Sequence, residues 1–273
     1  MLDIPIFQVD AFSEKAFGGN PAAVCPIPIM LAEAVLQNIA AENNLSETAF
    51  LLPLADDADA DYLLRWFTPA VEVDLCGHAT LASAHVVFTH LQPDIAEVRF
   101  STRSGILRVI RDGNRYRMSF PSLTPNPIDT PAGLGGAMGA DPTAVLKSDQ
   151  ADRDLLLVYP DAATVQSLTP DSSALKAFAP YGFIATAPGG EGEDEDFVSR
   201  CFFPNHGIAE DPVTGSAHCV SAPYWAGVLG KTELFARQIS ARGGDLWLSV
   251  KPDCVEISGY ATEVMRGTFT VPE

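Results

Sequence analysis

Three titratable side chains in this sequence have the type and the setting for acid–base chemistry. Glu47 stands between a polar asparagine pair and an apolar, strand-like run, where a carboxyl group is suited to proton transfer. His78 stands near the beginning of a charge-free segment, and a neutral imidazole there can donate a hydrogen bond to a substrate. Asp211 precedes a second segment of the same kind. The ordinary alternatives are a capping or surface glutamate, a structural histidine, and an aspartate stabilised by a helix dipole.

The first charge-free segment predicts a buried helix. Residues 76–93 include no Asp, Glu, Lys or Arg, and their small and apolar side chains leave no face of a helix for water. A helix that is apolar all round is buried. We therefore expect a buried helix over 77–91, whose first turn presents the backbone N–H groups of Gly77, His78 and Ala79. Such groups bind carboxylates and other anions.

The chain repeats this arrangement about half its length later. A Phe-Thr-Pro motif precedes Gly77, a Phe-Phe-Pro motif precedes Gly215, and each glycine opens a charge-free run. The second run predicts a buried helix over 215–229, which Pro223 should kink or shorten. Two buried helices at this spacing predict two domains of similar fold rather than a solenoid of short repeats.

The rest of the chain reads mostly as strands, which makes the expected fold class α+β. The Pro-, Thr- and Asn-rich segment 121–134 is expected to link a domain of residues 1–120 to a domain of residues 135–273. The last strand either completes the second sheet or returns to the first domain. The expected strands are 6–11, 22–25, 46–52, 62–67, 98–101, 107–111, 115–120, 155–158, 181–185, 198–203, 233–237, 246–250, 255–257 and 261–271, with helices at 31–43 and 172–178.

Composition excludes several classes of partner. With 35 acidic against 17 basic residues and a net charge of -18, the chain lacks the basic patches that nucleic acid and anionic membranes require. No apolar run reaches membrane-spanning length apart from the two expected core helices. The 47% hydrophobic content is ample for two cores within 273 residues. We expect a protein that binds neither nucleic acid nor membrane.

Neither a disulfide framework nor a metal site is indicated. The 5 cysteines are odd in number, widely spaced and include no Cys-x-x-Cys pair, which favours a reducing cytoplasm. The acidic, glycine-rich segment 189–196 has a spacing that fits no known metal loop, so we interpret it as a solvated surface loop. The sequence thus predicts no metal.

Four ordered sequence blocks and the opening of the chain resemble the phenazine-biosynthesis isomerase-like (PhzF-like) family. The blocks are Asn-Leu-Ser-Glu-Thr-Ala-Phe at 44–50, Arg-Trp-Phe-Thr-Pro at 65–69, Leu-Cys-Gly-His-Ala-Thr at 75–80 and Glu-Asp-Pro-Val-Thr-Gly-Ser-Ala at 210–217, and the opening comprises 7–12 and 18–24. The resemblance implies the diaminopimelate-epimerase-like fold: two pseudo-symmetric domains, each a mostly antiparallel, barrel-like sheet around a central helix. It also implies an active site in the cleft between them.

The resemblance implies a role for each matched residue. Glu47 matches the acid that shuttles a proton in the family's isomerase, and His78 and Asp211 match polar groups that hold the substrate. The helix starts at Gly77, and at Gly215 with Ser216, match the positions that bind the substrate carboxylate. The implied function is a cytoplasmic, cofactor-independent isomerase of a small carboxylate, with a homodimer left open. The substrate itself is not implied.

Two alternatives remain. Fold relatives that racemise or epimerise amino acids use one cysteine at each helix start, and this chain has Cys76 at the first but Thr214 at the second. A threonine hydroxyl is far too weak an acid to replace a thiol, so this two-base mechanism is disfavoured. A non-catalytic protein that holds a small anion on the same scaffold is the other alternative. The joint presence of all the matched site residues argues against it.

Overall fold

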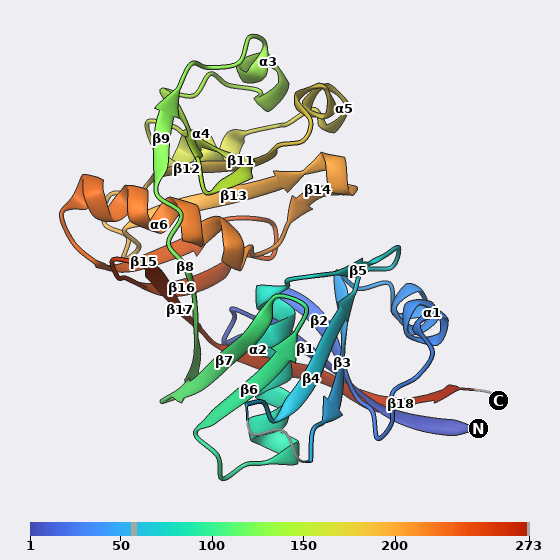
Figure 1. The fold of residues 1–273 in the computed structure, drawn as a ribbon. Helices are drawn as coiled ribbons and strands as arrows, with labels where there is room; N and C mark the ends of the chain where they lie inside the picture. The colour runs from blue at the N-terminus through green and yellow to red at the C-terminus, as the bar shows by residue number, and fades with distance from the viewer. Residues whose placement is uncertain (56–58, 272–273) are drawn as a thin grey trace. The chain divides into compact units, whose positions relative to one another are not determined.

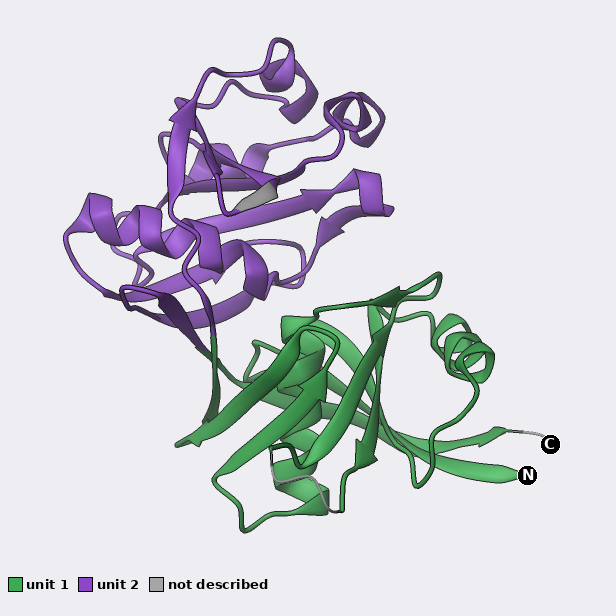
Figure 2. Cartoon of the chain, in the orientation of Figure 1, with its two compact units in different colours: residues 1–119, 258–273 green, residues 120–257 purple. Residues whose placement is uncertain are grey.

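A computed structural model describes residues 1–55 and 59–271, which form two compact units. Unit 1 comprises Met1–Ser119 and Ser258–Glu273, and unit 2 comprises Phe120–Ile257 (Figure 2). None of the helices in the described part of the chain combines the length and the apolar composition needed to span a bilayer.

Unit 1 is a curled sheet around one helix (Figure 1). Its sheet order is β18-β1-β2-β3-β4-β6-β7-β8, antiparallel except for the β2–β3 and β4–β6 pairs, and β5 pairs with β4. The elements are β1 (Leu2–Ala11), β2 (Asn20–Pro26), α1 (Glu33–Asn43), β3 (Glu47–Pro53), β4 (Tyr62–Phe67), β5 (Glu72–Val73), α2 (Gly77–Val86), η1 (Val87–Leu91), β6 (Glu97–Thr102), β7 (Gly105–Asp112), β8 (Arg115–Pro121) and β18 (Ala261–Val271).

Helix α2 is the core of unit 1. It packs against strands from both ends of the sheet order, including β18, β1, β2, β3 and β7, and eight of its 10 residues are buried. Two buried hydroxyls bond to carbonyls one turn earlier, Thr80 to Cys76 at 2.6 Å and Ser83 to Ala79 at 2.7 Å, which removes the cost of burying them. The helix expected over 77–91 is α-helical only to Val86 and ends in the π-helical turn η1.

Unit 2 has a second sheet with helix α6 against it. The strands pair in the order β9-β10-β11-β12-β13-β15-β16, with β14 also on β13. The elements are β9 (Pro125–Ile128), α3 (Leu134–Met138), β10 (Ala144–Ser148), β11 (Ala151–Val158), α4 (Ala162–Ser167), α5 (Ser172–Leu175), η2 (Lys176–Phe178), β12 (Gly182–Pro188), β13 (Phe197–Phe203), η3 (Pro204–His206), β14 (Ile208–Asp211), α6 (Gly215–Leu229), β15 (Glu233–Gln238), β16 (Gly244–Val250) and β17 (Cys254–Gly259).

Helix α6 is buried over its first three turns, but its end is not. Val228 is 57% and Leu229 40% exposed. The helix runs without interruption through Pro223, contrary to the expected shortening. A proline cannot donate to the carbonyl four residues back. That carbonyl, of Cys219, instead accepts a hydrogen bond of 3.0 Å from the backbone N–H of Leu123, so the missing helical bond is replaced.

The expected linker 121–134 is part of unit 2. Within it β9 pairs with β10, a strand that the sequence also did not predict, and the Leu123 N–H bonds to α6. Prolines suggested a linker, but Pro125 and Pro127 lie on a strand whose described pairing is to β10 alone, where a missing N–H is tolerated. The last strand, β18, pairs antiparallel with β1 and so belongs to unit 1.

Candidate active site

Glu47 occupies the first position of β3, and the turn before it fixes that position. Helix α1 ends at Asn43, and the next residue, Asn44, adopts a left-handed conformation with φ 51° and donates its backbone N–H to the carbonyl of Ala40. Asparagine tolerates this conformation better than most residues. The chain then enters β3, where Glu47 stands opposite Ala22 of β2 and is 9% exposed. A carboxyl group is thereby held in the interior on a rigid strand.

His78 lies in the first turn of α2 and meets Glu47 there. Its Nε2 is 2.9 Å from Glu47 Oε2, and its Nδ1 is 3.5 Å from the sulfur of Cys76. The carboxylate oxygen of Glu47, the sulfur of Cys76 and a ring nitrogen of His78, all buried, lie within 4.8 Å of one another. The sequence predicted roles for Glu47 and His78, but it disfavoured the two-base mechanism that would use Cys76. The signal that could have included it was its place immediately before the helix.

The contact between Glu47 and His78 is close but not aligned as a hydrogen bond. Although 2.9 Å separates the two atoms, neither Glu47 Oε2 nor His78 Nε2 has a hydrogen-bond partner among the described residues. We interpret the pair as an ion pair at contact distance whose N–H does not point along the line to the oxygen. Buried polar atoms are nearly always paired, so the two atoms have capacity for a further ligand.

Neighbouring groups favour the charged form of His78. Burial alone would lower its pKa, but Cys76 and Glu47 together raise the pKa well above the ordinary 6.5. Burial and the nearby Glu47 also raise the pKa of the Cys76 thiol, against the opposing effect of His78.

This electrostatic arrangement predicts a loss of stability in mildly alkaline solution. Because folding raises the pKa of His78, its contribution is complete below pH 6.5 and is lost as the pH rises through the folded-state value. The raised Cys76 pKa acts in the same direction. We expect the free energy of unfolding, measured with urea across a pH series, to fall more steeply in the wild type than in His78→Gln. Parallel curves would contradict the assignment.

Two other histidines, His218, which is buried, and His85, which is partly buried, do not affect this measurement. Burial lowers the pKa of His85 and of His218 to about 4. Both are therefore neutral in the folded and the unfolded protein above their ordinary pKa. Their effect on stability is confined to more acidic solution, where it has the opposite sign.

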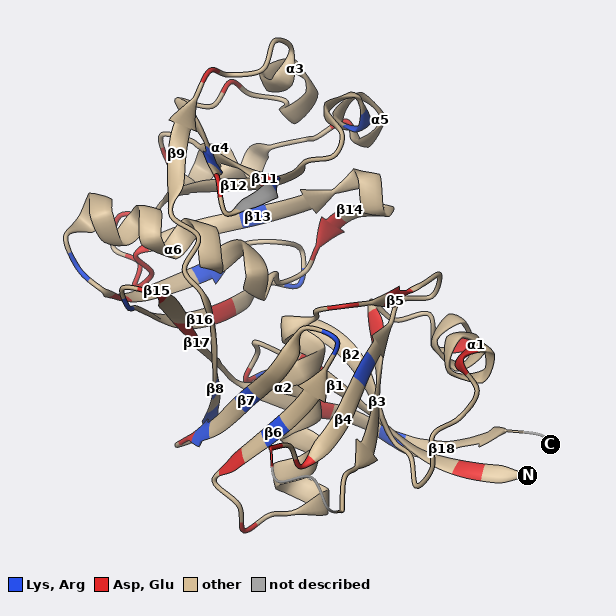
Figure 3. Ribbon diagram, viewed as in Figure 1, with Lys and Arg blue, Asp and Glu red and all other residues tan. Residues whose placement is uncertain are grey.

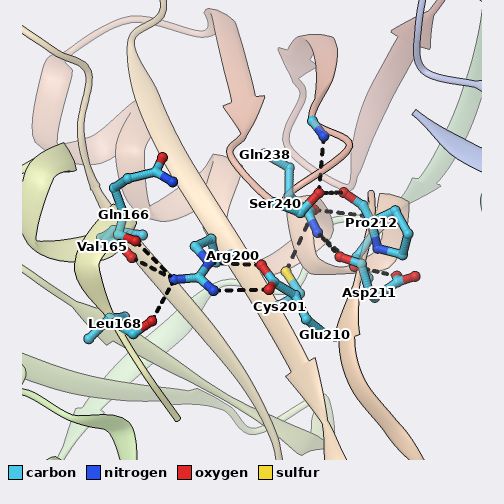
Figure 4. Close-up of polar contacts among 12 residues, drawn as sticks. Val165, Gln166, Leu168, Arg200, Cys201, Glu210, Asp211, Pro212, Gln238 and Ser240 are labelled. Atoms are coloured by element: carbon cyan, nitrogen blue, oxygen red, sulfur yellow. Dashed lines mark hydrogen bonds and ion pairs between the residues drawn. The ribbon is translucent and has the colours of Figure 1, made fainter. Parts of the chain in front are cut away.

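Asp211 lies in unit 2, at the end of β14, where its side chain bonds to Thr214, the residue before α6. Its Oδ2 accepts a hydrogen bond of 2.5 Å from the hydroxyl of Thr214, and its carbonyl accepts one of 2.7 Å from Gln238 Nε2. The amide oxygen of Gln238 accepts the backbone N–H of Thr214 at 2.8 Å. Figure 4 shows Gln238 beside Asp211 in this network. Sequence analysis missed Gln238, which is fully buried and far from both partners along the chain.

The helix starts carry the expected anion-binding residues. Gly77 and Ala79 lie in the first turn of α2, and Gly215 and Ser216 lie in the first turn of α6. Among the residues that the structure describes, the preceding Cys76 and Thr214 make no side-chain capping hydrogen bond. First-turn N–H groups have no acceptor within their own helix. Both starts therefore keep donors available for a negatively charged group.

Each unit also contains an arginine that forms an ion pair with a glutamate in the segment before its central helix. In unit 1, Arg65 of β4 donates through Nε and Nη2 to both oxygens of Glu72 at 2.7 and 2.6 Å. In unit 2, Arg200 of β13 donates in the same way to Glu210 at 2.8 and 2.9 Å. In Figure 3 basic positions colour β4 and β13, and acidic positions colour β5 and β14.

The two arginine–glutamate clamps correspond in their details. Each glutamate stands five residues before the first glycine of the helix. Each guanidinium lies over the phenylalanine two residues further on, 5.1 Å from the ring of Phe67 or Phe202. A bidentate arginine–carboxylate pair fixes orientation as well as distance. The two ion pairs thus fix the position of the short strand that precedes each helix. The repeated Arg-x-Phe motif was the signal for them in the sequence.

Arg200 has a further task in unit 2. Its Nη1 donates to the carbonyls of Val165, Gln166 and Leu168 at 3.1, 3.3 and 2.9 Å, as Figure 4 shows. These carbonyls lie at the end of α4 and just beyond it, where a helix leaves acceptors unpaired. One side chain therefore joins α4 to the segment before α6.

Comparison with known proteins identifies the family. The family model described as phenazine biosynthesis-like protein matches residues 9–267. The chain belongs to this PhzF family. An uncharacterized isomerase of Pseudomonas aeruginosa is 51% identical over 98% of this chain and 99% of its own length. The mouse phenazine biosynthesis-like domain-containing protein 2 is 40% identical over 98% of this chain and 100% of its own length.

Solved structures agree with the family and with the fold. A PhzF-family protein of Enterococcus faecalis is 44% identical, has a TM-score of 0.92 and is matched over 99% of this chain and 100% of its own. A hydroxyproline epimerase of Agrobacterium vitis shares the fold at 12% identity, with a TM-score of 0.59 over 97% and 92%. The expected epimerase-like α+β fold is therefore confirmed. As a PhzF-like protein with relatives named as isomerases, the chain is an isomerase.

Proposed function

We propose that this PhzF-like isomerase moves a proton between two carbons of a small carboxylate substrate without a cofactor, with Glu47 as the acid–base group. The observation that carries the proposal is the buried pair of Glu47 Oε2 and His78 Nε2, 2.9 Å apart and without hydrogen-bond partners among the described residues. A carboxylate with spare capacity, held on a strand, can take a proton from an acidified C–H group and return it to another carbon.

The other site residues have supporting roles in this proposal. The His78 imidazolium, with its raised pKa, stabilises negative charge that develops on the substrate. The substrate carboxylate is bound by first-turn N–H groups of the two helices, Gly77 and Ala79 in α2 and Gly215 and Ser216 in α6. We propose, as the family resemblance implies, that these groups face one cleft between the domains, and that Asp211 lines it too.

The two-base racemase mechanism has less support. The hydroxyl of Thr214 is committed to Asp211 at 2.5 Å and also accepts from Gln238 at 3.3 Å, which is a structural use. The nearby thiol of Cys219 lies within α6, and burial raises its pKa to about 12. Neither group supplies a second base near neutral pH. The arrangement in unit 2 therefore favours a single proton-transfer group in unit 1.

Incubation with a panel of small, conjugated carboxylic acids in deuterated water would test the proposal. We expect the wild type to isomerise at least one acid, as followed by NMR, and Glu47→Gln to leave that acid unconverted. Saturable binding of an acid that is never converted would favour the non-catalytic anion binder instead.

The cytoplasmic location is a proposal too, supported by five free cysteines. The homodimer that the sequence left open is tested by sedimentation of the pure protein.

A further inference from the structure

The cluster of Glu47, Cys76 and His78 combines a carboxylate, a thiol and an imidazole in one buried place. These are the three side-chain types that bind zinc in proteins. From their geometry we propose that this cluster is a binding site for a thiophilic divalent cation of the Zn²⁺ class, and that the bound cation blocks the isomerase. The inhibitory part rests on the function proposed above, whereas the binding part does not.

The distances allow coordination after small side-chain movements. The ligand atoms lie within 4.8 Å of one another, and Glu47 Oε2 is 2.9 Å from His78 Nε2. Zinc–ligand lengths of about 2.0 to 2.3 Å place the ligands of a tetrahedral site roughly 3.3 to 3.8 Å apart. The oxygen and nitrogen must therefore separate slightly. The sulfur lies 3.5 Å from the other ring nitrogen, Nδ1, so the imidazole and the Cys76 side chain must turn to bring all three ligand atoms around one ion.

The fold holds the ligands on rigid elements. Cys76 occupies the position immediately before α2 and His78 lies in the first turn, while Glu47 begins β3, and α2 packs directly against β3. A site built on a helix and a strand is held more accurately than one on loops. The sequence could not show this site, because Cys-x-His is only two ligands and the third comes from another element.

A cation would also provide a partner for the polar atoms of the cluster that have none. Glu47 Oε2 and His78 Nε2 have no hydrogen-bond partner among the described residues. Coordination requires the Cys76 thiol and the His78 imidazolium each to release a proton to solvent, so that a thiolate, a neutral imidazole and a carboxylate face a double positive charge. One coordination position remains for water.

The same atoms cannot serve the cation and the substrate together. Glu47 must keep a free carboxylate oxygen to accept a proton in the proposed isomerisation. When that oxygen coordinates a cation, proton transfer stops. A thiophilic cation is thus expected to compete with the substrate for this part of unit 1.

Titration of the purified, reduced chain with Cd²⁺ tests the binding, because a cadmium–thiolate bond has a characteristic ultraviolet absorption band. We expect a saturable band in the wild type, no such band in Cys76→Ser, and at least about tenfold weaker affinity in Glu47→Gln and His78→Asn. Cys254→Ser is the matched control, since Cys254 is a free and partly exposed cysteine in unit 2. It should keep the band and the affinity.

Serine is a good helix cap, so Cys76→Ser should fold, which circular dichroism can check. Persistence of the saturable band in this variant, or its absence from the wild type, would overturn the proposed site. Addition of Zn²⁺ to a turnover assay tests the inhibition separately. Turnover that continues with the site saturated would overturn the inhibitory role. If no carboxylate is turned over at all but the Cd²⁺ results hold, the proposed function fails while the cation site stands.

Discussion

Glu47→Gln is expected to abolish turnover while leaving the fold and ligand binding nearly unchanged. Glutamine keeps the shape of the side chain and one hydrogen-bonding oxygen, but it cannot exchange a proton. Loss of a positioned acid–base group typically costs about 10²- to 10⁴-fold in rate, and the proposed mechanism has no substitute for it. The loss should lie in kcat, measured on a substrate found with the carboxylate panel, with Kd measured separately by calorimetry.

The matched control is Glu42→Gln, at an exposed glutamate of α1 in the same unit. It should keep wild-type kcat. His78→Ala and Asp211→Asn should differ from both, because they are assigned to holding the substrate and should weaken binding as well as rate. Turnover by Glu47→Gln at the wild-type rate would remove this carboxylate from the chemistry.

The substitution Arg200→Met should cause the largest loss of stability among the polar contacts of unit 2. Its side chain is only 12% exposed, and its removal takes the guanidinium donor from Glu210 and from the carbonyls of Gln166 and Leu168, while Val165 keeps the backbone N–H of Leu168. Leaving partly buried polar groups without their hydrogen-bond donor costs about 1 to 3 kcal/mol, because these groups remain shielded from water. Urea unfolding followed by fluorescence measures this loss.

Arg108→Met is the control for this prediction. Arg108 is 64% exposed and meets Glu97 at 3.4 Å, so its loss should change the free energy of unfolding by no more than about 1 kcal/mol. In addition, Arg200→Met combined with Glu210→Met should recover part of the stability, since no carboxylate is then left alone. Equal effects of the two arginine substitutions would show that Arg200 is an ordinary surface contact.

The sequence predicted the central helices well because their signal is local. A run without charges needs no knowledge of its partners to be interpreted as buried, and α2 and α6 both begin at the expected glycines. Glu47 was placed correctly at a strand start for the same reason, since Asn44 and the apolar run after it mark the turn.

Features that depend on distant partners could not be predicted in this way. Segment 121–134 has the composition of a linker, yet Leu123 replaces a helical hydrogen bond that Pro223 cannot make. Gln238 acts on Asp211 from another strand. Cys76 joins Glu47 only because α2 packs on β3. In each case tertiary packing brings the partner close, and a single sequence does not show which distant residues pack together.

The pairing of β18 with β1 has a consequence for synthesis of the chain. Strand β1 leaves the ribosome well before β18, which pairs with it from Ala11 back to Leu2. Unit 2 is complete in the nascent chain before unit 1 has all of its strands. Domains generally fold as units during synthesis, so unit 2 should reach its native state before unit 1. Until β18 has been synthesised, one edge of β1 lacks its native partner, and an unpaired strand edge can pair with another chain and aggregate.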